Sequence, residues 1–329
     1  MTDIWKKIYR IFGFAISIVC LYFVFKGIQW GQVASTFARA NPFNLTLSAL
    51  FQLLSLGMAG FRWKAVINLP EVSWSSTSAS MMVGLMVNNI FPGRIGELVR
   101  PIMLGGEVKR SGSFLFATVI IDRLSDLLVL VILALLSFGM FPSLSWAREM
   151  SLIGGGIVLL AFFLIGIFSY SKIGLKLDGM VRQFVPGRFY EQIIDNLKKF
   201  RLGFQTVKSI RRGAAIFGLS WLVWGTWFLC LYYALNAFEL ALPFWGMILL
   251  LAVLNLGALV PASPGYAGTY HLLGILVLSA FGIKKEDALS FILVFHALWY
   301  ITQTLIGLII LAQKNLKLWQ ILETKTLVT

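Results

Sequence analysis

Charged residues and cysteines are scarce in this sequence. Only 13% of its 329 residues are charged, whereas 58% are hydrophobic. A soluble domain of this length could not bury that much apolar surface in one core. The scarcity of charge therefore indicates that lipid surrounds most of the chain and excludes a large soluble catalytic domain.

The two cysteines and the amino terminus exclude further classes. Cys20 and Cys230 both lie inside apolar runs, which argues against a disulfide framework. Lys6, Lys7 and Arg10 precede a hydrophobic run, as in a secretory signal, but no small-x-small cleavage site follows. We therefore expect a retained first helix.

Long apolar runs predict an all-α polytopic membrane protein. A spanning helix needs roughly 20 mostly apolar residues. Two further apolar stretches, at 78–104 and 244–281, are interrupted by Pro and Gly. We predict a single transmembrane domain over residues 1–329 with about six full spans, at Ile11–Phe25, Phe43–Phe61, Ser113–Phe138, Leu152–Tyr170, Ala214–Leu235 and Ala288–Gln313.

The basic residues predict the orientation. A net charge of +14 would suggest nucleic acid as a partner of a soluble protein. Here the basic residues gather in loops between spans, which favours a topological role and no nucleic-acid partner. The predicted cytoplasmic segments, which include Arg62 and Lys64, hold twenty Lys and Arg residues against five outside. We predict a multi-pass protein of a bacterial or archaeal cytoplasmic membrane, with both termini in the cytoplasm.

The longest predicted loop, residues 171–213, is a basic connector on the cytoplasmic side. It holds ten basic residues, and Phe189, Ile193, Leu197, Phe200 and Phe204 repeat at helical spacing. Two interpretations remain open. The helix lies on the anionic leaflet, or it packs beneath the bundle as a connector.

The two interrupted stretches resemble each other. Residues 92–97 read Pro-Gly-Arg-Ile-Gly-Glu, and residues 264–269 read Pro-Gly-Tyr-Ala-Gly-Thr. Each motif follows an apolar helix that carries asparagine. By the charge pattern, the first stretch enters and leaves from the cytoplasm and the second from outside. We therefore predict inverted repeats, residues 30–140 and 214–313, with broken helices of the kind that mark transporter binding sites.

Backbone hydrogen bonding explains why a break marks a site. Pro and Gly leave N–H and C=O groups unpaired, and lipid cannot satisfy them. We predict two re-entrant hairpins, with turns between full spans as the alternative. The predicted substrate-binding residues are Asn88, Asn89, Pro92, Gly93, Arg94, Gly96, Glu97, Arg100, Pro264, Gly265, Tyr266, Gly268 and His271.

Charges in or beside the apolar segments predict an intramembrane ion network. An unpaired charge at mid-bilayer costs roughly 2.5 to 3.5 kcal/mol. Asp122 and Asp126 share a helix face beside Arg123, and they suit pairing with arginines of the preceding hairpin. Arg94 and Arg100 are candidates to bind a phosphate in bidentate fashion. Alternatively, the network pins the hairpin to its neighbouring span. A polar stripe in the last span comprises His296, Tyr300, Gln303 and Thr304.

At these residues the sequence resembles the lysylphosphatidylglycerol synthase transmembrane-region family, also called flippase-like or UPF0104 membrane proteins. Three blocks carry the resemblance, residues 88–100, 122–126 and 261–268. The family implies a role in translocating or handling membrane lipids. Because this sequence ends at Thr329, we expect no synthase activity. At the second motif it departs from the family, with Tyr266 and Ala267 in the middle and His271 near the place of an acid.

Three functions remain as hypotheses. The first is a flippase or scramblase that binds an anionic phospholipid or lipid-linked head group at mid-membrane. The second is an intramembrane lipid transferase, but the spacing of Asp122 and Asp126 matches no aspartate-rich metal motif, and no nucleophile lies beside a histidine base. The third is a non-transporting partner of a lipid- or glycan-modifying enzyme. We expect a protein without enzymatic activity, metal or cofactor.

Overall fold

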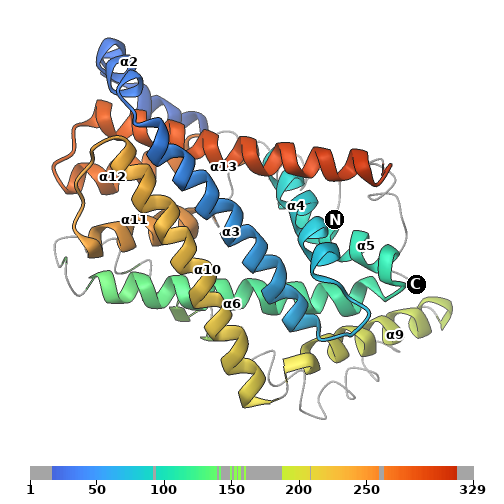
Figure 1. Cartoon of the computed structure of the whole chain (residues 1–329). Coiled ribbons are helices and arrows are strands. Elements are labelled where there is room, and N and C mark those ends of the chain that lie inside the picture. Colours follow the sequence, from blue (N-terminus) through green and yellow to red (C-terminus); the bar gives the residue numbers. More distant parts are fainter. Residues whose placement is uncertain are drawn as a thin grey trace.

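The protein is an all-α polytopic membrane protein. A computed structural model describes residues 17–91, 94–138, 187–207, 209–258 and 263–316, with a few positions between 141 and 160. These residues form helices joined by short loops, without any strand among them. Figure 1 shows the helices as one bundle in which the long members run past one another. The predicted span Leu152–Tyr170 and the start of Ile11–Phe25 lie largely outside the described residues.

Four long helices form the bundle: α3 (Pro42–Ile67), α6 (Gly112–Phe138), α10 (Ile210–Ala237) and α13 (Lys285–Gln313). They contain 26, 27, 28 and 29 residues. At about 1.5 Å per residue, each is long enough to cross a hydrocarbon core of about 30 Å. Of the described helices, α3, α10 and α13 are also apolar enough to span a membrane. Helix α6 carries Asp122, Arg123 and Asp126.

Shorter helices complete the described fold. They are α2 (Trp30–Ala38), α4 (Trp74–Ile90), α5 (Gly96–Val108), α9 (Gly187–Phe204), α11 (Phe244–Gly257) and α12 (Thr269–Ala280), with single turns η1 (Gln205–Val207) and η2 (Pro264–Tyr266). Helices α11 and α12 contain 14 and 12 residues, so they extend only about 21 and 18 Å. Both lengths are below the thickness of about 30 Å of a hydrocarbon core. Figure 1 shows α4 and α5 toward one end of the long helices, and α11 and α12 toward the other.

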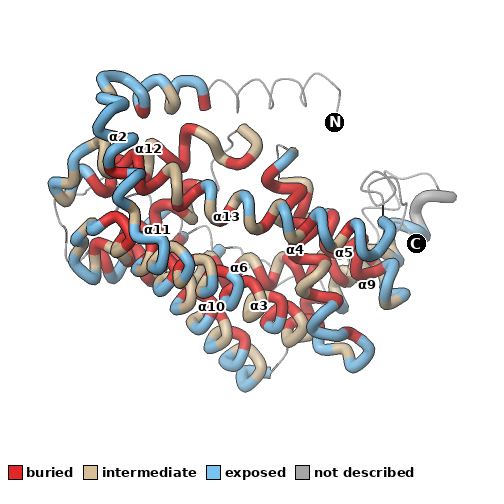
Figure 2. The backbone as a smooth tube through the Cα atoms, turned by 45° about the horizontal axis from the view of Figure 1, so that its top comes forward, coloured by how far each residue is buried: buried red, intermediate tan, exposed pale blue. Residues whose placement is uncertain are grey.

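Burial follows the bundle geometry. The largest apolar cluster joins α10, α11, α12 and α13 with the second half of α6. Figure 2 shows buried residues where helices face one another and exposed residues along the outer faces. Large apolar side chains on those faces, such as Leu53, Leu222 and Leu305, are about half exposed. An exposed leucine row on a spanning helix contacts lipid, so the outer faces form the lipid boundary.

The described part of the basic connector packs against the bundle. In α9, the Phe200 ring stacks on Phe116 of α6 with centroids 6.2 Å apart. Ser113 Oγ donates to Asn196 Oδ1 at 2.9 Å, and Phe204 is buried. The end of α9 that carries Phe200 and Phe204 therefore packs against α6, whereas Ile193, nearer its start, is 38% exposed. Both interpretations of residues 171–213 stay predictions.

One predicted boundary is wrong. The sequence placed the end of a span at Phe61 and counted Arg62 among the cytoplasmic residues. The structure continues α3 to Ile67 and buries Arg62, whose side chain is 1% exposed. The helix can carry this charge into the bundle because two carboxylates of α6 meet it there.

Candidate functional site

The breaks of the two hairpins meet inside the bundle. Arg94, just before α5, donates from its guanidinium to the Ala258 carbonyl oxygen at 2.6 Å, although 164 residues separate them. The same guanidinium lies 5.6 Å from the ring centroid of Tyr266 in η2. Arg94 adopts a left-handed backbone conformation, with φ of 53°, which turns the chain between α4 and α5. Pro92 and Gly93 lie outside the described residues.

Asparagines at the end of α4 hold the first break together. The Gly96 N–H, at the start of α5, donates to Asn88 Oδ1 at 2.8 Å. Asn88 Nδ2 in turn donates to Glu97 Oε1 at 3.3 Å. Asn89 Nδ2 donates to Thr304 Oγ1 of α13 at 3.1 Å. The side chain of Asn88 thus caps a helix that has no cap from its own preceding residue.

Asp122 lies between two arginines from different elements. Its Oδ1 accepts from Arg62 Nε at 2.9 Å, and its Oδ2 accepts from an Arg100 terminal nitrogen at 3.0 Å. All three side chains are 1% exposed. Arg62 also reaches Asp126 at 2.5 Å and donates to Ser220 Oγ. Buried charges of this kind are tolerated because each is paired and hydrogen-bonded.

Glu97 links the network to the first break. It pairs with Arg123 at 2.7 Å and with Arg100 at 3.3 Å. The Arg100 guanidinium also lies over the Trp63 ring, 4.4 Å from its centroid. The site thus brings together four arginines and three carboxylates. Arg94 is the one arginine of the four without a carboxylate partner within the described ranges, so the site carries one excess positive charge.

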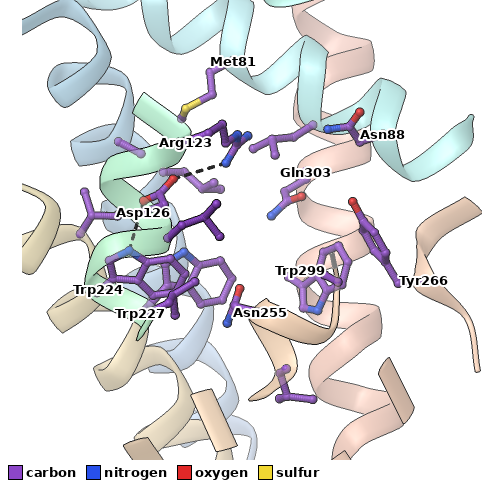
Figure 3. Close-up of a pocket in the computed structure, with 18 of the residues that line it drawn as sticks. Met81, Asn88, Arg123, Asp126, Trp224, Trp227, Asn255, Tyr266, Trp299 and Gln303 are labelled. Carbon is purple, nitrogen blue, oxygen red and sulfur yellow. Dashed lines mark hydrogen bonds and ion pairs between the residues drawn. The ribbon is translucent and has the colours of Figure 1, made fainter. Parts of the chain in front are cut away.

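A cavity of about 250 Å³ adjoins this network. Its walls come from α3, α4, α5, α6, α10, α11, α12 and α13 and from both breaks. Figure 3 shows Arg123 and Asp126 on one side, indoles of Trp224 and Trp227 below them, and Gln303, Trp299 and Tyr266 opposite. The cavity therefore combines an arginine-rich polar wall with an aromatic one.

The structure places many of the predicted site residues at this cavity and others behind its wall. The predicted residues that line it are Asn88, Asn89, Arg94, Glu97, Asp122, Arg123, Asp126, Tyr266 and Gln303. Gly96 packs against Gly84, and Arg100 lies behind Asp122. Pro264, Gly265, Gly268, His271, His296 and Tyr300 are not among the lining residues.

Sequence reasoning missed several lining residues. Arg62 and the aromatic residues Trp224, Trp227, Tyr270 and Trp299 all line the cavity. A signal for Arg62 was present, because apolar residues continue beyond it to Ile67 at helical spacing. The tryptophans gave no such signal, since a tryptophan in an apolar span is ordinary.

His271 and His296 form a buried pair behind the cavity. His271 Nδ1 accepts from the Gly268 N–H at 3.2 Å and thereby caps α12. Its Nε2 lies 3.1 Å from His296 Nδ1. An accepting Nδ1 requires a proton on Nε2 of a neutral ring, so His271 donates to His296.

The family model described as lysylphosphatidylglycerol synthase TM region matches residues 10–307. The chain therefore belongs to this family of membrane proteins. It is 24% identical to a UPF0104 membrane protein of Pyrococcus horikoshii, over 95% of this chain and 98% of that protein. It is 25% identical to a UPF0104 membrane protein of Methanothermobacter thermautotrophicus, over 82% and 85% of the two chains. No solved structure matches the chain.

Proposed function

We propose that this protein is a membrane lipid transporter, a flippase or scramblase, that binds an anionic lipid head group in the cavity between its two hairpins. One observation carries the proposal. Arg94 lies at the meeting point of the two breaks, lines the cavity and has no carboxylate partner among the described residues. The family, which is named after the transmembrane region of a lipid synthase, is compatible with this role.

The chemistry of Arg94 supports an anionic ligand. Its present acceptor is a neutral carbonyl, that of Ala258. A phosphate adds a full negative charge and can accept two parallel hydrogen bonds from the guanidinium, whereas the carbonyl accepts one. The other three arginines of the site already hold carboxylates, so the excess positive charge resides on Arg94. A head-group phosphate can therefore displace the carbonyl without leaving a buried acid unpaired.

The same contact suggests how binding couples to movement. One side-chain bond from Arg94 joins the break of the α4–α5 hairpin to the break of the α11–α12 hairpin. A ligand that takes this bond removes a link between the two hairpins. We propose that the hairpins then separate toward one membrane face or the other, as in alternating access at a repeat interface. In this proposal the end of the bundle that carries Lys109 and Lys314 faces the cytoplasm. We also propose that the protein has no enzymatic activity.

Reconstitution tests the proposal. Purified protein in liposomes should move fluorescent phosphatidylglycerol between leaflets. Chemical quenching of the fluorophores in the outer leaflet measures this movement. Arg94→Gln should slow this movement about ten-fold or more, because a charge-assisted hydrogen bond is worth about 1.5 to 3 kcal/mol. The matched control is Arg110→Gln, since Arg110 is half exposed and pairs with Glu71. Absence of movement with any anionic lipid would contradict transport and favour a partner of a lipid-modifying enzyme.

A further inference from the structure

We propose that the transported head group carries a ring-shaped polyol, a sugar or an inositol, next to its phosphate. The inference rests on the proposed function and narrows its substrate class. The polyol would bind at the aromatic end of the cavity, defined here by the rings of Trp224, Trp227, Trp299, Tyr266 and Tyr270 and by the amides of Asn255 and Gln303.

Gln303 is the strongest sign of a ligand at this end. It lies on α13, is only 5% exposed and lines the cavity. Figure 3 shows its amide pointing into the open space between the aromatic residues. Its side chain has no hydrogen-bond partner among the described residues. A primary amide has two donors and an acceptor, and those of Gln303 face the cavity, where they are free to bind a ligand. A ligand that both donates and accepts, as a hydroxyl does, would satisfy it.

Two neighbouring groups add free hydrogen-bonding capacity. Asn255 Nδ2 donates to the Leu251 carbonyl at 2.8 Å, which leaves its Oδ1 available. The indole N–H of Trp227 makes no hydrogen bond with the described residues, whereas that of Trp224 donates to Asp126. The acceptor oxygen of Asn255, the indole N–H of Trp227 and the amide of Gln303 thus belong to residues that line one cavity beside flat aromatic faces. Sugar rings combine apolar C–H faces, which stack on indoles, with a rim of hydroxyls, which bind amides.

The charges of the site disfavour the alternative of an amine-bearing head group. Aromatic walls can bind cations. Here, however, Glu97, Asp122 and Asp126 are each paired with arginine, and Arg94 leaves the site with an excess positive charge. An added ammonium would meet repulsion from Arg94 and no free carboxylate among the described residues. A bare phosphate, in turn, could accept from the Gln303 amide nitrogen but would offer no hydroxyl donor to the amide oxygen.

Binding of tail-matched lipids tests the inference. Native mass spectrometry of the full chain in detergent would give Kd for phosphatidylinositol, phosphatidic acid, phosphatidylethanolamine and phosphatidylcholine. We expect phosphatidylinositol to bind about ten-fold or more tightly than phosphatidic acid, the equivalent of one or two satisfied hydrogen bonds. Gln303→Leu should remove this preference and leave phosphatidic acid binding within about two-fold. Gln313→Leu, an exposed position on the same helix, should behave as the unmodified protein.

The outcomes separate the two proposals. Equal affinity for phosphatidylinositol and phosphatidic acid would overturn the polyol inference while anion binding stands. So would a Gln303→Leu protein that loses both lipids alike. Tighter binding of phosphatidylethanolamine than of either anionic lipid would overturn both proposals. No preference for either anionic lipid over phosphatidylcholine would overturn the proposed function itself. If Gln303→Leu does not fold, Trp227→Leu replaces it, since Trp227 is half-buried and lines the cavity. That variant should likewise lose the preference for phosphatidylinositol over phosphatidic acid.

Discussion

Among single residues, Asp122 shows how the bundle can hold charge. It shares its two oxygens between Arg62 of α3 and Arg100 of α5. Both arginines are almost fully buried, so each depends on this carboxylate for compensation. Arg100 has Glu97 as a second partner at 3.3 Å, and Arg62 has Asp126. Asp122 therefore ties three helices together through one side chain.

Asp122→Asn should destabilise the folded protein strongly. The change leaves two buried guanidiniums with incomplete compensation, and breaking a buried ion pair costs about 3 to 5 kcal/mol. The Tm of the purified protein in detergent measures the effect. Asp287→Asn is the control, because Asp287 lies in the first turn of α13 and accepts a single hydrogen bond from Thr36 Oγ1. Equal Tm values for the two variants would refute the structural role of the network.

At the scale of helices, the first hairpin depends on a close approach of α4 and α5. A Cβ on Gly96 would lie 1.9 Å from the Gly84 carbonyl oxygen. Such glycine contacts let helices approach closely within membranes. The same approach brings Gly96 N–H to Asn88 and places Glu97 beside Arg100 and Arg123. Helix packing and the polar site are therefore made by the same few residues.

Gly96→Ala should disrupt this hairpin. Backbone atoms of α4 cannot move out of the way cheaply, so we expect a loss of about 1 to 3 kcal/mol, the usual cost of overpacking. Gly106→Ala on the same helix is the matched control, because its Cβ would meet no atom within 4 Å. There, alanine should be neutral or slightly stabilising, since it favours helix by up to about 1 kcal/mol. The Tm in detergent distinguishes the two variants. Similar Tm values would contradict the close packing of α4 against α5.

At the scale of the whole molecule, the two hairpins lie toward opposite ends of the long helices and meet at their breaks (Figure 1). Lys314 at the end of α13 pairs with Glu107 of α5 at 2.8 Å, at the end opposite to Lys285. Lys285 instead donates to the carbonyls of Phe23 and Lys26. The two ends of the bundle are thus closed by different contacts.

Cysteine labelling tests this arrangement. With Cys20 and Cys230 replaced by Ser, single cysteines at Lys109, Lys284 and Lys314 would be probed with a membrane-impermeant maleimide. We expect Lys284→Cys to react in intact cells, and Lys109→Cys and Lys314→Cys to react only after the membrane is opened, as positive-inside orientation requires. Labelling of all three from the same side would exclude hairpins that face opposite membrane surfaces.

The sequence by itself determined the class of fold and the residues at the breaks. Its long apolar runs require lipid as solvent, and helices are the structure that satisfies their backbone there. The motif around Arg94 and the acids of α6 were also visible, because Pro, Gly and charge are conspicuous within apolar sequence. These are local properties, so the chain order alone reveals them.

Only the tertiary structure decided which charges pair and where the cavity lies. Arg62 resembles a loop residue in the sequence, and it becomes buried because α6 brings two carboxylates to it from 60 and 64 residues away. Trp227 and Trp299 read as ordinary members of spans, and Gln303 as one member of a polar stripe, until helix packing turns them toward one cavity. Pairing and convergence depend on how helices rotate against one another. That rotation is set by contacts between distant segments, which no local pattern specifies.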